Sequence, residues 1–204
     1  FDWTADPKRQ PLFNQEDPSY KGAVWGRDVP KLTGANVAFA VRARVVLLRD
    51  LGAPLSPFNA FQIIQGLETV AIRMKQHCVN AEKVVKFLET QKKVKNVIYP
   101  TNHQGEIKDR AKRYMKGGYG SLVGMDVGTR EAGSRFIDNL KMLYHVANIG
   151  DARSLAIHPA TTTHSQLNDK ELLAAGVTPG YVRLSIGIEH PDDIIGDIKQ
   201  ALAA

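Results

Sequence analysis

The stretch that most constrains the fold of this chain runs from Tyr181 to Glu189, where apolar and polar residues alternate strictly. The apolar positions are Val182, Leu184, Ile186 and Ile188, and the polar positions are Tyr181, Arg183, Ser185, Gly187 and Glu189. An alternation with period two predicts a β-strand that packs one of its faces on helices. Gly180 before the stretch and Pro191 after it are typical of strand boundaries.

Arg183 is the only cation on the polar face of this predicted strand. A guanidinium held on a rigid strand can bind a carboxylate or a phosphate through two parallel hydrogen bonds. The alternative is an arginine on the solvent face of a strand, because exposure is the norm for charged side chains. The strand alone leaves both interpretations open.

The remaining pattern predicts an α/β protein in which helices pack on one face of a mixed or antiparallel sheet. Ser56 followed by Pro57 is typical of a helix start, and apolar residues then recur at steps of three and four from Phe61 to Leu88. Further strands are expected at 94–99, 122–127 and 144–149, and further helices at 129–143, 172–175 and 192–202.

Two other features of the chain lead to expectations about its interior and its start. Cys78 lies on the apolar stripe of the long helix and is expected to be a packed core thiol, whereas His77 beside it receives no role. Residues 1–31 show no period and contain four prolines among scattered aromatics, which predicts either an ordered loop pinned by the aromatics or a disordered arm. The chain opens with phenylalanine and is expected to continue a longer chain upstream.

Charge and cysteine content exclude several classes of protein. A single cysteine excludes an internal disulfide framework and a cysteine-based zinc cage. The apolar runs are too short to cross a bilayer and no basic-then-apolar leader opens the chain, so we expect a cytoplasmic location and no membrane partner. Ten of the 27 Lys and Arg residues fall between Lys83 and Lys116. Because no nucleic-acid-binding motif accompanies them, a solvated surface is favoured over a nucleic-acid partner.

The segment Gly150–His164 is dense in hydroxyl groups and histidines and lies between two apolar strand patterns. His158 and His164 are six residues apart with no third ligand nearby, which disfavours a zinc site. A serine-hydrolase nucleophile elbow, Gly-x-Ser-x-Gly, is also missing. Ser154 could instead join Arg183 in a clamp of hydroxyl and guanidinium groups that binds a small carboxylate.

Several runs of the sequence, in order and at matching spacing, are similar to one known family. These runs are LRDLGAPLSPFNAF (48–61), QGLET (65–69), RM (73–74), GD with SL (150–155), HPATTTH (158–164) and VRLSIGIE (182–189). They resemble the Cys/Met-metabolism family of pyridoxal-phosphate enzymes. The first run, with DPSY at 17–20, most resembles the branch of that family that replaces the acetoxy group of O-acetylhomoserine with sulfide to give homocysteine.

The resemblance implies the C-terminal part of a fold-type I pyridoxal-phosphate-dependent transferase. Residues 1–66 would be the tail end of the large cofactor-binding domain and a linker, and residues 67–204 the C-terminal small domain. The resemblance further implies a homotetramer, a small amino-acid substrate whose α-carboxylate is held by Arg183, and assistance to that contact by Ser154.

One departure from the family pattern concerns the cofactor. The family's Schiff-base lysine lies in a Ser-x-Thr-Lys motif, and this chain contains no such motif. A lysine amine at the ring is indispensable to this chemistry. We therefore expect no catalytic or cofactor-binding residue in this chain, an upstream half that carries the pyridoxal phosphate, and no activity of this chain by itself. Alternatives are a related cystathionine synthase, a methionine or cystathionine lyase, or a non-catalytic carboxylate-binding domain.

Overall fold

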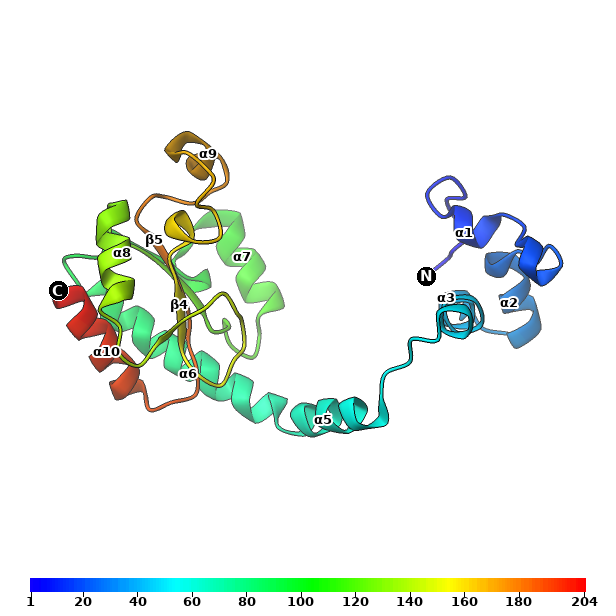
Figure 1. Cartoon of the computed structure of the whole chain (residues 1–204), viewed down its shortest axis with the longest axis horizontal. Helices are drawn as coiled ribbons and strands as arrows, with labels where there is room; N and C mark the ends of the chain where they lie inside the picture. Colours follow the sequence, from blue (N-terminus) through cyan, green and yellow to red (C-terminus); the bar gives the residue numbers. More distant parts are fainter. The chain divides into compact units, whose positions relative to one another are not determined.

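The computed structural model describes all 204 residues, and the chain divides into two compact units, Phe1–Ile64 and Gln65–Ala204 (Figure 1). The boundary falls inside helix α5 (Pro57–Glu68). None of the helices has both the length and the apolar character that crossing a membrane requires. The predicted assignment of residues 1–66 to a cofactor-binding domain and linker stays a prediction.

Unit 1 is built from short helical segments around a small aromatic core. The segments are α1 (Pro11–Asn14), η1 (Pro18–Tyr20), α2 (Trp25–Thr33), α3 (Ala38–Arg42), the π-helical η2 (Ala43–Leu48) and α4 (Arg49–Leu51). The rings of Trp3 and Phe13 stack with centroids 4.5 Å apart, and Trp25 donates its indole N–H to Asp17 Oδ2 at 2.9 Å. The expected pinning by aromatics is confirmed, but α2 was not predicted because Pro30 stands inside it.

Unit 2 contains a five-stranded sheet in the order β1-β2-β5-β4-β3. The strands are β1 (Asn96–Ile98), β2 (Leu122–Asp126), β3 (Tyr144–His145), β4 (Leu155–Ile157) and β5 (Tyr181–Ser185). All neighbours are antiparallel except β3 and β4, which are parallel. The predicted mixed sheet is confirmed. The last strand is shorter than expected: it ends at Ser185, and Ile188, expected on the apolar face, is exposed.

Three helices cover one face of this sheet, as Figure 1 shows: α6 (Val70–Glu89), α8 (Arg130–Asp138) and α10 (Pro191–Ala203). The strand residues that point to these helices are fully or almost fully buried. They are Val97, Val123, Met125, Ala156, Val182 and Leu184, and Ile186, directly after β5, is buried with them. Burying one such aliphatic side chain contributes about 1.5–3 kcal/mol, so this face is the core of unit 2.

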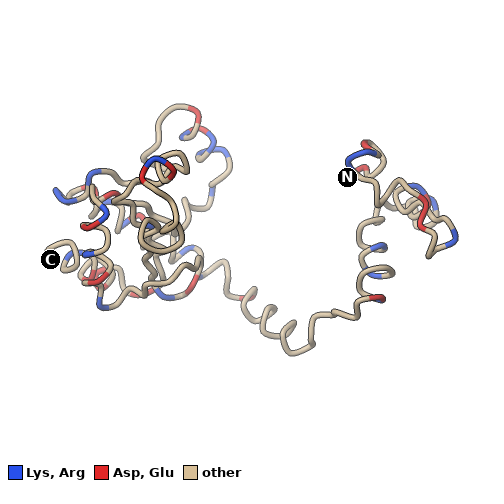
Figure 2. The backbone as a smooth tube through the Cα atoms, turned by 45° about the horizontal axis from the view of Figure 1, so that its top comes forward, with Lys and Arg blue, Asp and Glu red and all other residues tan.

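The predicted single long helix is interrupted at Thr69, where α5 ends and α6 begins. Its predicted apolar stripe is buried only in α6, from Cys78 to Leu88. Helix α5 buries no residue at all, although Phe58, Phe61 and Leu67 lie on it. Helix α5 contains almost no charged residues, as Figure 2 shows. The apolar periodicity therefore predicted helix correctly, but it did not predict that α6 packs in the core while α5 has no packing partner.

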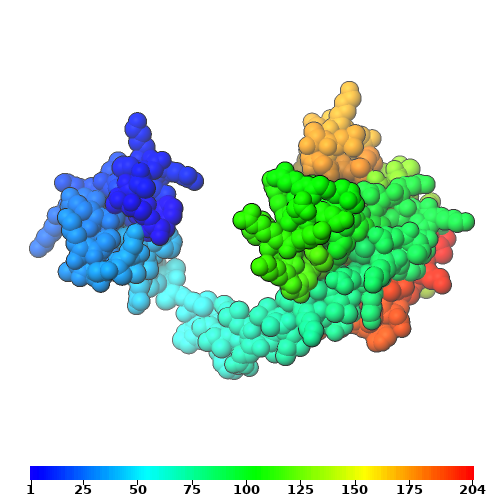
Figure 3. All heavy atoms as spheres, turned by 180° about the vertical axis from the view of Figure 1, so that it is seen from behind, coloured from blue at the N-terminus to red at the C-terminus, as the bar shows by residue number.

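Two further helices lie outside the covered face: α7 (Gly105–Tyr114), which was not predicted, and α9 (Asp169–Ala174). Helix α9 begins with a capping box formed by Asn168 and Glu171. The segment that carries α9, orange in Figure 3, projects from the rest of unit 2. Arg130 ties this segment to α8 through an ion pair with Asp169 at 3.0 Å.

Helix α8 ends at Asp138, five residues earlier than expected, because a carboxylate from α10 binds the backbone that follows. Asp197 accepts hydrogen bonds from the N–H groups of Lys141, Met142 and Leu143, each at 2.9 Å. Burial of Asp197 opposes its ionisation, but these backbone hydrogen bonds and one from Gln200 outweigh that effect and lower its pKa. The 141–143 turn is thus fastened to α10 by one ionised group.

We expect Asp197→Asn to lower the free energy of unfolding of unit 2 by about 2 kcal/mol at pH 7, because the amide accepts fewer and weaker hydrogen bonds. The folded-state pKa lies below the unfolded value of about 3.9, so this stabilisation is present above that value and is lost as the pH falls through the folded-state pKa. Hydrogen exchange of the most protected amides of unit 2 measures it, with exposed Asp109→Asn as the control. Equal stability of the two variants would contradict the assignment.

Candidate functional site

Arg183 lies on the face of the sheet opposite to the helix-covered core. In β5 its neighbours Val182 and Leu184 point into that core and are fully buried. Arg183 pairs with Gly124 of β2 and with Ile157 of β4. Because paired residues of neighbouring strands point to the same face, the guanidinium stands on a rigid central strand beside a glycine.

A hollow of about 200 Å³ opens beside Arg183 on this face. Its lining comprises Ile98, Tyr99, Pro100, His103, Leu122, Val123, Gly124, Tyr181 and Arg183. Gly124 is required here, since a Cβ at this position would lie only 2.7 Å from the ring of Tyr181. Burial raises the pKa of Tyr181, which therefore stays a neutral phenol beside the cation. The hollow offers one fixed positive charge among mostly apolar walls.

The guanidinium of Arg183 has little to bind within the chain. Its single hydrogen bond is a long one, 3.4 Å from Nη2 to the carbonyl oxygen of Asn148. Its Nε atom is buried without a partner, and none of the ion pairs of the structure involves it. A buried donor left unpaired is costly, so this group is suited to an external carboxylate.

Ser154 lies on the other side of the sheet from Arg183. Leu155, the next residue, pairs with Ser185 on the Arg183 face, and alternation turns Ser154 towards the core, where it is fully buried. Its hydroxyl donates to Glu189 Oε2 at 2.9 Å and accepts from the N–H of Gly187 at 2.8 Å. The predicted assistance to Arg183 stays a prediction, and in this structure the hydroxyl already has two partners.

Helix α6 holds the segment that follows β5 with two buried polar side chains. His77 Nδ1 lies 2.6 Å from the carbonyl oxygen of Ile186. Asn80 donates to the carbonyl oxygens of Gly187 at 3.0 Å and Glu189 at 2.8 Å. Both side chains are 1% exposed or less. These contacts fasten the end of the strand that carries the guanidinium.

His77 therefore has a structural role that was not predicted, and the importance of Asn80 and Glu189 was missed as well. The only sequence signal was the spacing: His77 and Asn80 are three residues apart and flank the buried stripe of one helix. The expectation for Cys78 is confirmed, because it is a free, buried thiol.

His158 is engaged through both ring nitrogens. Nε2 lies 2.8 Å from the carbonyl oxygen of Pro179, and Nδ1 lies 2.9 Å from the hydroxyl of Thr161. Burial lowers the pKa of His158 more than the Pro179 contact raises it, and nearby Arg130 lowers it further. The imidazole is thus a packed, uncharged group that holds the loop before β5.

The lysines of the chain do not provide the amine that pyridoxal phosphate requires. A Schiff-base lysine is activated by burial or by neighbouring cations at the ring, yet no lysine side chain of this structure is buried. None follows a threonine in the sequence. The residues present therefore do not fit the group by themselves, and no catalytic step through it is derived from them.

Comparison with known proteins identifies the family. Residues 22–203 match the profile of the Cys/Met metabolism PLP-dependent enzymes. An O-acetyl-L-homoserine sulfhydrylase from Leptospira meyeri is 48% identical over 196 residues, which are 93% of this chain and 44% of that protein. A homocysteine synthase from Schizosaccharomyces pombe is 42% identical over 203 residues, 99% of this chain and 46% of that protein.

A solved structure agrees with the sequence relatives. The crystal structure of a Campylobacter jejuni protein described as an O-acetylhomoserine (thiol)-lyase, with a pyridoxyl-lysine at its own position 205, matches with a TM-score of 0.83 and 41% identity. The match covers 97% of this chain and 46% of that chain. The chain belongs to the Cys/Met metabolism PLP-dependent enzyme family, and it spans about half the length of the relatives it matches.

We expect Asn80→Ala to destabilise the turn after β5 by about 2–3 kcal/mol, because two buried carbonyl groups lose their donor. Hydrogen exchange of the Ile188 amide, which donates to Ala152, reports this loss directly. Lys75→Ala, an exposed change on the same helix, serves as the control. Unchanged exchange in the Asn80 variant would show that the turn does not depend on this side chain.

Proposed function

We propose that this chain is the C-terminal portion of a pyridoxal-phosphate-dependent O-acetylhomoserine sulfhydrylase, in which it contributes the substrate-carboxylate clamp. The complete enzyme would convert O-acetylhomoserine and sulfide to homocysteine and acetate. The observation that carries the proposal is Arg183, whose guanidinium has no acidic partner, leaves its Nε without an acceptor and lies on a central strand beside a small hollow. The relatives of similar sequence carry the names of sulfhydrylases and homocysteine synthases, which supports it.

When bound, the cofactor supplies the electron sink for bond cleavage next to the amino acid's α-carbon. The part of this chain is to hold the substrate. Arg183 would receive the α-carboxylate through two hydrogen bonds and so orient the amino acid towards the other half of the protein. The contacts of His77 and Asn80 with the carbonyl groups after β5 keep this strand in register. They thereby preserve the position of Arg183.

The remaining parts of the proposal concern partners. We propose that an upstream half of the same protein provides the Schiff-base lysine and the cofactor site, and that the complete protein is a cytoplasmic homotetramer. The bare apolar surface of α5 supports a missing partner, since Phe58, Phe61, Ile64 and Leu67 are each more than half exposed. Contiguous exposed apolar surface usually marks an interface.

In the complete enzyme, Arg183→Ala is expected to lower kcat/KM for O-acetylhomoserine about 100-fold, mostly through a higher KM, because a charge-assisted pair is lost. Arg183→Lys should recover only part of the loss, since an ammonium cannot bind a carboxylate in fork geometry. Steady-state kinetics measure both, and Arg110→Ala on exposed α7 is the control. A normal KM in the Arg183 variants would refute the clamp.

A second test asks whether this chain is active without the proposed upstream half. The isolated chain, given pyridoxal phosphate, O-acetylhomoserine and sulfide, is expected to form no homocysteine above background, because it contains no buried lysine. Adding the separately produced upstream half should restore turnover, and an Arg183→Ala chain should restore much less. Replacing sulfide by cysteine distinguishes a sulfhydrylase from a cystathionine synthase. Turnover by the isolated chain would overturn the division of roles.

A further inference from the structure

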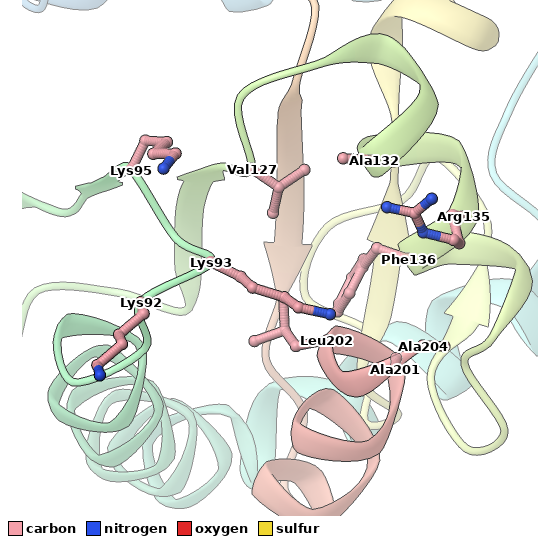
Figure 4. Close-up of a pocket in the computed structure, with 10 residues that line it drawn as sticks. All are labelled: Lys92, Lys93, Lys95, Val127, Ala132, Arg135, Phe136, Ala201, Leu202 and Ala204. Atoms are coloured by element: carbon pink, nitrogen blue, oxygen red, sulfur yellow. The ribbon is translucent and has the colours of Figure 1, made fainter.

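The basic stretch between Lys83 and Lys116 takes no part in the proposed function, yet three of its lysines meet at one place. Lys92, Lys93 and Lys95, from the connection between α6 and β1, line a hollow of about 290 Å³. Arg135 of α8 closes the opposite side (Figure 4). The hollow lies wholly within unit 2 and shares no lining residue with the one beside Arg183.

Two of these cations are directed into the hollow. In Figure 4 the Lys93 side chain extends across it towards Phe136, and the guanidinium of Arg135 points into it from α8. Lys95 stands at the far rim, whereas Lys92 points away from the centre. Lys93 and Arg135 come from different elements, so their convergence is a product of the tertiary fold.

The four cations lack acidic partners. The ion pairs of the structure all involve other residues. Lys93 donates one hydrogen bond, 3.2 Å to the carbonyl oxygen of Ala203 at the end of α10, which is the ordinary role of a cation at a helix C-terminus. The side chains of Lys92, Lys95 and Arg135 make no such contact. The interaction with the C-terminus of α10 therefore explains the position of Lys93, but it does not explain why three more cations lie around the hollow.

The floor of the hollow is apolar. It is formed by Val127 directly after β2, by Ala132 and Phe136 of α8, and by Ala201 and Leu202 of α10, and the terminal residue Ala204 also lines the hollow. An anion alone would leave these side chains in contact with water, whereas an anion that carries a small apolar group would cover them. The volume of about 290 Å³ suits a molecule of metabolite size.

We propose that this hollow is a binding site for a small organic phosphate, a phosphomonoester with a compact apolar or aromatic group. A phosphate dianion offsets the repulsion between Lys93 and Arg135 better than a carboxylate does. Lysine and arginine are also the usual phosphate ligands, one as a point charge and the other as a planar fork. The apolar group lies against Phe136 and Leu202. This site is independent of the sulfhydrylase reaction.

The test is a titration of the 204-residue chain with phenyl phosphate, followed by backbone amide NMR shifts. Phenyl phosphate has no aldehyde and therefore cannot form a Schiff base with a lysine, so its binding reports recognition of the anion alone. We expect saturable shifts at 127–136 and 201–204, and an affinity at least about tenfold lower in the double variant Lys93→Gln with Arg135→Gln. The matched control is Lys112→Gln with Arg113→Gln, which removes the same two charges from exposed α7 and should leave the affinity unchanged.

Other outcomes overturn the site. Equal weakening in both double variants would mean that net charge alone attracts the anion. Binding of inorganic phosphate as tightly as phenyl phosphate would contradict the role of the apolar floor. A single-stranded DNA oligonucleotide that binds these residues while phenyl phosphate does not would show a nucleic-acid surface instead. Absence of any saturable shift with wild-type chain would refute the proposal outright.

Discussion

The central position of β5 is the constraint on which the rest of unit 2 depends. This strand pairs with β2 on one side and with β4 on the other, and its alternate residues serve two opposite purposes. Val182 and Leu184 enter the core under three helices, while Arg183 stands on the other face. Because the side-chain period of a strand is two, a slip by one residue would bury the guanidinium and expose the core.

The end of this strand is held by polar contacts and not by apolar packing. His77 and Asn80 reach from α6 to the carbonyl groups after β5, and Glu189 turns back to the N–H and hydroxyl of Ser154. All of these groups are buried or nearly so, and such networks are costly when only partly formed. The position of the arginine is therefore coupled to a buried hydrogen-bond network at the end of its own strand, in which the Nε2 of His77 alone has no partner.

The structure also contains groups that remain unsatisfied within the chain itself. The Nε of Arg183 is buried without a partner, and α5 exposes a row of large apolar side chains. The Nε of Arg183 lacks a hydrogen-bond acceptor, and the apolar side chains of α5 lack a covering surface. Each feature is unfavourable by itself. Both would be resolved by the upstream half proposed above, which would bring the substrate carboxylate to Arg183 and cover α5.

The sequence by itself determined the type and order of most elements in unit 2, because the periods of two and 3.6 follow from local backbone geometry. It also placed Arg183 on the polar face and indicated the family. Only the tertiary structure decided that the stripe of α5 stays bare, that His77 and Asn80 fasten the end of β5, and that Ser154 faces away from Arg183. The last two facts rest on contacts between residues more than thirty positions apart, such as Ser154 with Glu189 and Asn80 with Gly187. The same holds for Lys93 and Arg135, which spacing along the chain could not bring together.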